Sequence, residues 1–71
     1  MRPVTPGQIV RLGLTNGHQF DVTVVRTGKA RVTVKHAAHT SASGHHYTEY
    51  LKAYDFARFE AMRVMAETKP A

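Results

Sequence analysis

The chain has 71 residues, 42% of them hydrophobic, a net charge of +5 and no cysteine. This length excludes a second domain, and the absence of cysteine excludes a disulfide framework and a cysteine-based zinc site. No stretch approaches the roughly 20 apolar residues of a membrane-spanning helix, and the N-terminus lacks the apolar run of a signal peptide. We therefore expect a single cytoplasmic domain over residues 1–71, with no membrane partner.

Residues 1–7 contain two prolines and a glycine, which predicts an irregular arm. The segment Gln8–Lys35 predicts a three-stranded antiparallel meander, because apolar and polar residues alternate between two glycine-containing turns. The residues expected on the inward face of this meander are Val10, Leu12, Leu14, Phe20, Val22, Val24, Ala30, Val32 and Val34.

The first turn is predicted to be a three-residue loop, Thr15–Gly17, with its glycine in the left-handed conformation. A two-residue turn would place Leu12 opposite Asp21, and opposed residues share a face of the sheet. The longer loop instead places Leu12 opposite Phe20 and Arg11 opposite Asp21, as a cross-strand ion pair on the outer face. It also pairs Val10 with Val22.

The second turn follows the same reasoning. A three-residue loop over Arg26–Gly28, again with a left-handed glycine, keeps apolar residues opposite one another. The expected pairs are Val24 with Ala30, Val22 with Val32, and Phe20 with Val34.

Small and polar residues over 37–45 predict a flexible loop. His46–Leu51 is compatible with a fourth strand, after which Asp55 would cap a helix over Phe56–Glu67. The alternative is one long helix over Glu49–Glu67. We favour the strand and the shorter helix, because a long helix would expose two phenylalanine rings. Residues 68–71 are expected to fray.

These elements predict an α+β fold, in which a three- or four-stranded antiparallel meander is covered on its apolar face by one C-terminal helix. The opening Pro6-Gly7-Gln8-Ile9-Val10, leading into a twisted meander, is similar to that of small SH3-like barrels. This resemblance covers about half of the chain and implies a partly curled sheet.

Positive charge is concentrated in the first part of the chain. Residues 1–47 contain six basic residues and one acidic residue, whereas residues 48–71 contain four of each. This asymmetry favours an anionic partner, and the first hypothesis is a module that binds DNA or RNA mainly by electrostatic attraction. The meander face expected to make these contacts has no aromatic residue, and we assign the three tyrosines to core packing. The expected phosphate contacts are Arg11, Arg26, Lys29, Arg31 and Lys35.

The second hypothesis is a small adaptor or inhibitor of the kind that phages and plasmids encode. The helix has more apolar surface than one small sheet should need, so it is expected to dock on a protein target or form a homodimer. The residues expected to take part are Phe56, Phe59, Met62, Arg63 and Ala66.

No pattern in the sequence predicts catalysis or a cofactor. Ser41 and Ser43 lie near histidines, but no carboxylate is placed to orient a catalytic base. The histidines of residues 36–46 lack the cysteine or carboxylate ligands that usually complete a zinc site. We therefore expect a non-enzymatic protein without a metal or cofactor.

Overall fold

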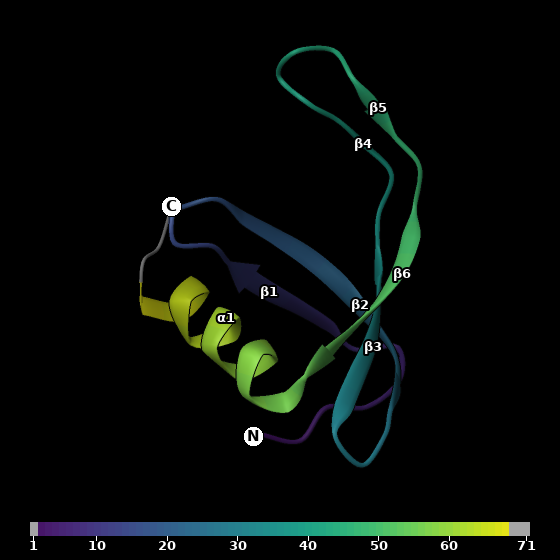
Figure 1. Ribbon diagram of the computed structural model, residues 1–71, viewed down its shortest axis with the longest axis vertical. Helices are drawn as coiled ribbons and strands as arrows, with labels where there is room; N and C mark the ends of the chain where they lie inside the picture. Colours follow the sequence, from purple (N-terminus) through teal and green to yellow (C-terminus); the bar gives the residue numbers. More distant parts are fainter. Residues whose placement is uncertain (1, 69–71) are drawn as a thin grey trace.

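In a computed structural model that describes residues 2–68, the chain forms a four-stranded antiparallel sheet and one C-terminal helix (Figure 1), which confirms the predicted α+β fold. The strand order of the sheet is β1-β2-β3-β6, and a separate two-stranded ribbon pairs β4 with β5. The elements are β1 Ile9–Gly13, β2 Gln19–Thr27, β3 Arg31–His36, β4 His39–Thr40, β5 His46–Tyr47, β6 Tyr50–Asp55 and α1 Phe56–Thr68.

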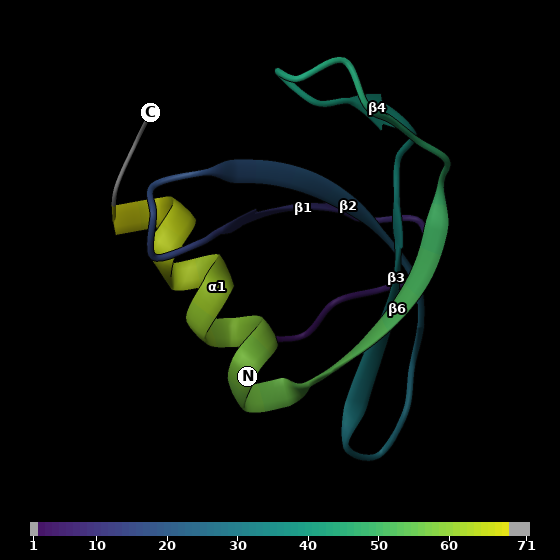
Figure 2. The same ribbon diagram turned by 45° about the horizontal axis from the view of Figure 1, so that its top comes forward.

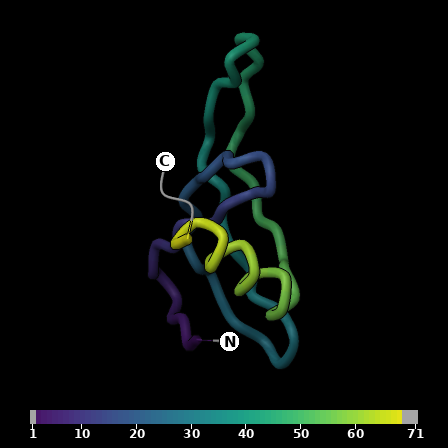
Figure 3. The backbone as a smooth tube through the Cα atoms, turned by 90° about the vertical axis from the view of Figure 1, so that its left-hand side faces the viewer, coloured from purple at the N-terminus to yellow at the C-terminus, as the bar shows by residue number. Residues whose placement is uncertain are grey.

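The helix α1 lies across one face of the curved sheet, mainly over β1, and the β4–β5 ribbon extends beyond the sheet at one end (Figures 2 and 3). Alternate residues of β1, β2 and β3 point toward α1, because side chains in a strand alternate between its two faces. The buried apolar residues of the sheet and of α1 form one core, which includes Val10, Leu12, Val22, Val24, Val32, Val34, Phe59 and Met62.

The predicted β1–β2 register is confirmed. Leu12 lies opposite Phe20 and Arg11 opposite Asp21, with the Arg11 Nε to Asp21 Oδ1 distance at 3.0 Å. Gly17 has a φ of +88°, a left-handed conformation that favours glycine.

The predicted β2–β3 register is wrong. Val24 lies opposite Val34 instead of Ala30, and a bulge at Val25 interrupts the pairing before β2 continues to Thr27. The loop therefore begins later than expected, and Gly28 does not adopt the left-handed conformation. Before the bulge, the partner of each β2 residue lies four residues further along the chain than predicted. Because four is an even number, the same side chains still point inward. Ala30 is the exception, because it is exposed.

A fourth strand followed by a short helix is confirmed, but the strand runs over Tyr50–Asp55 and not over the predicted His46–Leu51. Asp55 Oδ1 accepts a 2.7 Å hydrogen bond from the backbone N–H of Arg58, and so caps α1. The strand begins at Tyr50, later than predicted, because His46–Tyr47 pairs with His39–Thr40. Part of the segment predicted as a loop is therefore β4, and its flexibility stays a prediction. Of the predicted frayed tail, Thr68 belongs to α1 and residues 69–71 lie outside the described range.

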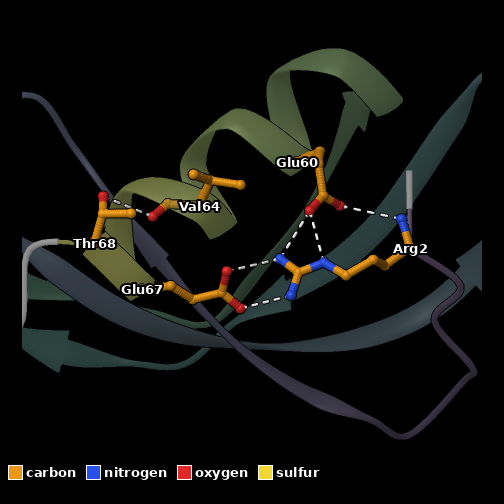
Figure 4. Close-up of polar contacts among 5 residues, drawn as sticks. All are labelled: Arg2, Glu60, Val64, Glu67 and Thr68. Atoms are coloured by element: carbon orange, nitrogen blue, oxygen red, sulfur yellow. Dashed lines mark hydrogen bonds and ion pairs between the residues drawn. The ribbon is translucent and has the colours of Figure 1, made fainter.

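Residues 2–7 of the N-terminal arm form no helix or strand, and Arg2 holds the arm against α1 (Figure 4). The Arg2 guanidinium lies 2.8 Å from a Glu60 carboxylate oxygen and 2.7 Å from a Glu67 carboxylate oxygen. The arm therefore supplies a cation to two carboxylates of α1. The side chain of Val4 extends the core beneath the arm.

Candidate nucleic-acid interface

The structure places most of the predicted phosphate-binding cations on the sheet face that points away from α1. Arg11, Arg31 and Lys35 alternate with buried residues, and Arg26 lies opposite Thr33 after the bulge in β2. Lys29 lies in the turn between β2 and β3. We call the sheet face that points away from α1 the outer face, and we count these five cations, including Lys29 of the turn, as part of it.

Two of these cations already have carboxylate partners. Arg11 pairs with Asp21, and the hydrogen bond between these side chains raises the pKa of the Arg11 guanidinium above its ordinary value. Lys35 Nζ lies 3.9 Å from a Glu49 carboxylate oxygen. The other three cations are Arg26, Lys29 and Arg31, and we call them the basic hairpin end. Within residues 2–68, no carboxylate lies at ion-pair distance from any of them.

The residues predicted to dock a protein through α1 lie mostly on its buried side. Phe59 is fully buried, Met62 and Ala66 are nearly so, and Phe56 is half-buried against the core. The exposed side of α1 contains Val64 and two alanines. One apolar side of α1 therefore belongs to the core, which includes Phe59, Met62 and Ala66, whereas the other side is exposed. Docking of a protein on this helix stays a prediction and would have to use the exposed side.

A groove of about 710 Å³ lies where α1 leaves the inner face of the sheet uncovered, at the ends of β2 and β3 that are remote from the basic hairpin end. Both α1 and β6 contribute to its lining, as do the first residues of the β4–β5 ribbon. We call it the aromatic groove, and the residues important here are Phe20, His36, Tyr50, Lys52, Tyr54 and Arg58.

Four aromatic rings follow one another across this groove, and we call this series the stack, although the planes of Phe20 and His36 are tilted by 33°. His18 lies 5.9 Å from Phe20 between ring centroids, and Phe20 lies 5.3 Å from His36. His36 and Tyr50 stack in parallel, with centroids 4.6 Å apart and planes inclined by 2°. Tyr50 is at the end of this stack and 45% exposed, so much of its ring remains accessible.

Hydrogen bonding fixes the middle of the stack. His36 Nε2 and the Tyr54 hydroxyl are hydrogen-bonded at 2.9 Å, and both residues are buried. Burial lowers the pKa of His36, as do the nearby charges of Lys52 and His39, and this favours the neutral imidazole. Burial also raises the pKa of Tyr54. The hydrogen bond between His36 and Tyr54 restrains the orientation of both rings.

The groove has a positive balance of charge. Lys52 and Arg58 line it, and the Lys52 ammonium lies 5.3 Å from the centroid of the Tyr54 ring. Asp21 is the one acidic residue among the described residues that line the groove, and it already pairs with Arg11. The arrangement combines exposed aromatic surface with cations, as in sites that bind anionic aromatic ligands.

Sequence reasoning missed this groove because it assigned the tyrosines to core packing. Tyr50, Lys52 and Tyr54 occupy every second position of β6 and therefore share a face. That alternation was visible in the sequence. The uncovered part of the inner face was not, because it depends on where α1 crosses the sheet.

Within residues 2–68, no three histidine, aspartate or glutamate side chains are grouped closely enough to hold a metal ion. Across the same residues, no helix has the length and apolar character needed to cross a bilayer. Comparisons with protein-family models, with curated proteins and with solved structures found no match to this chain.

Proposed function

We propose that this chain is a non-enzymatic nucleic-acid-binding module that contacts phosphates through its outer face. The observation that carries the proposal is the basic hairpin end, where Arg26, Lys29 and Arg31 are exposed and have no carboxylate at ion-pair distance within residues 2–68. Because these cations need not break an ion pair, they can neutralise phosphates and release counterions.

Lys35 and Arg11 are secondary contacts in this proposal. Each must exchange a carboxylate for a phosphate, so each contributes less to the affinity than an unpaired cation. Exposed ion pairs are worth about 0–1 kcal/mol, so this exchange remains feasible at the surface. Contacts of this kind go to the sugar–phosphate backbone and carry little sequence preference.

The test is fluorescence anisotropy with labelled oligonucleotides between about 50 and 200 mM salt. We expect log affinity to fall linearly with log salt, and Arg26→Gln with Arg31→Gln to reduce the slope by about two, one for each lost phosphate contact. Arg11→Gln is the matched control, because it also removes an outer-face arginine but one that is already paired. No binding at the lowest salt, or equal effects of the paired and unpaired arginines, would contradict the proposal.

A protein partner remains the second candidate, supported by one observation. Val64 is 43% exposed on the side of α1 that faces away from the sheet, beside the exposed Ala57 and Ala61. An adaptor, inhibitor or homodimer would use this side and not the buried one. Val64→Glu should then dissociate a complex or dimer in sedimentation experiments while leaving the circular dichroism spectrum unchanged.

A further inference from the structure

We propose that the aromatic groove binds an unpaired nucleobase, which stacks on the open face of Tyr50 while Lys52 and Arg58 contact the adjoining phosphates. This inference rests on the proposed function, because it adds a preference for single strands to binding by the outer face. None of the cations assigned to the outer face lines the groove, so the two surfaces can be tested separately.

Tyr50 has the geometry of a stacking platform. One side of its ring is covered by His36 in a nearly parallel stack at 4.6 Å, and 45% of the residue is exposed. His36 in turn is held by its hydrogen bond to Tyr54, so the platform is ordered before any ligand arrives. Every base has a flat π-face, and a preordered aromatic ring is the surface on which unpaired bases stack.

The charges around the ring favour a nucleotide over an apolar segment. Lys52 and Arg58 line the same groove, whereas its aspartate is already engaged with Arg11. An apolar peptide would leave both cations without a partner. A nucleotide supplies the phosphate that the cations attract and the ring that stacks on tyrosine, so it uses both features of the groove.

The proposed stacking on Tyr50 requires an unpaired base. Its volume of about 710 Å³ is within the range of about 300–1,000 Å³ typical of small-ligand sites, and it is bordered by α1 on one side and β6 on the other. In a duplex the base faces are covered by their neighbours, so they cannot reach Tyr50 without unstacking. A single strand presents such faces at little cost.

The experiment compares three labelled ligands by fluorescence anisotropy at one salt concentration. They are a single-stranded 12-mer of thymidines, the same length of abasic sugar–phosphate, and the thymidine strand in duplex with its complement. The abasic ligand has the same phosphates but no bases. We expect the wild-type protein to bind the thymidine strand about fivefold or more tightly than the abasic strand, as the contribution of one stacked base implies.

Substitutions at Tyr50 then assign this advantage to the groove. Tyr50→Leu should abolish the advantage of bases over abasic phosphate, and Tyr50→Phe should preserve it. Tyr47→Leu is the matched control, because Tyr47 is 44% exposed but lies in the ribbon, outside the residues that line the groove. An advantage that survives Tyr50→Leu, or that is absent from the wild type, overturns the proposal.

A second variant keeps the test decisive if the first one does not fold. If Tyr50→Leu loses its circular dichroism spectrum, Lys52→Gln replaces it. That variant should weaken binding of the thymidine strand and reduce its salt slope by about one, and an unchanged slope overturns the proposal.

The outer-face variant with Arg26→Gln and Arg31→Gln separates the two proposals. It should weaken binding of the thymidine and abasic strands equally and leave the base advantage intact. If the base advantage is present but this variant binds normally, the groove is supported and the outer-face proposal fails. If the wild type binds none of the three ligands, both proposals are overturned.

Discussion

Gly13 marks the closest approach between the sheet and α1, and Gly13→Ala should therefore destabilise the fold. A Cβ added at this position would lie 2.9 Å from the backbone nitrogen of Ala66, 3.1 Å from its Cα and 3.2 Å from the carbonyl carbon of Met65. These neighbours are backbone atoms, so no side-chain rotation can relieve the contact. The helix has to move away from β1 and loosen the core around Phe59 and Met62.

The magnitude follows from two opposing effects. Overpacking of this kind costs about 1–3 kcal/mol. Replacing glycine also restricts the unfolded chain, which stabilises the protein by about 0.4–1 kcal/mol. We expect a net loss of about 1–2 kcal/mol in the free energy of unfolding, and each kcal/mol corresponds to a fall of about 4–8 °C in Tm for a domain of this size.

Urea denaturation followed by circular dichroism measures this loss, with Gly28→Ala as the matched control. A Cβ at Gly28 would lie 3.6 Å from the carbonyl oxygen of Arg31, an ordinary van der Waals contact, and neither glycine is left-handed. The control should be unchanged or slightly more stable. If Gly13→Ala unfolds at the same urea concentration as Gly28→Ala, α1 does not contact β1 as closely as described.

Three further predictions concern single contacts. Asp55→Ala should lower the free energy of unfolding by about 1 kcal/mol by removing the helix cap, whereas Asp55→Asn should keep most of it in the same urea assay. Burial lowers the pKa of His36 in the folded state, so the unfolded chain binds its proton more readily, and stability should fall as the pH drops below about 6.5. His36→Gln should show a smaller loss between pH 7.5 and 5, and an equal loss would contradict this origin. The pKa of Glu67 is held below its ordinary value by its hydrogen bond with Arg2, so Arg2→Ala should raise that pKa in an NMR titration, whereas no change would show that the pair does not persist in solution.

The register of the first hairpin could be predicted from the sequence, because a shift of one residue would turn every side chain of the strand to the other face of the sheet. The aspartate at position 21 excluded the two-residue turn, and the structure shows the resulting pairing with Arg11. The second hairpin had no such constraint. A shift of four residues keeps the same faces, so parity alone could not distinguish the predicted pairing of Val24 from the observed one, nor reveal the bulge at Val25.

The sequence predicted where the phosphate-binding candidates lie, but not which of them are free of a carboxylate partner. Alternation placed Arg31 and Lys35 on the outer face, and the structure shows the same arrangement. Which cations are already paired depends on contacts between distant segments, such as Lys35 with Glu49. Alternation with Val32 and Val34 places His36 on the inward face. Its burial, however, depends on the β6 residues packed beside it, Tyr50 and Tyr54.

The lengths of the elements explain why part of the inner face stays open. The 13 residues of α1 span about 20 Å, whereas the nine residues of β2 span about 30 Å. The helix cannot cover the whole length of the sheet, so the remaining face must tolerate water. Its rings are histidine and tyrosine as well as phenylalanine, and amphipathic rings can pack on one side while their polar atoms stay hydrogen-bonded. The same incomplete cover that limits the core therefore leaves an ordered aromatic surface beside two cations, which is the basis for proposing that the groove binds a base.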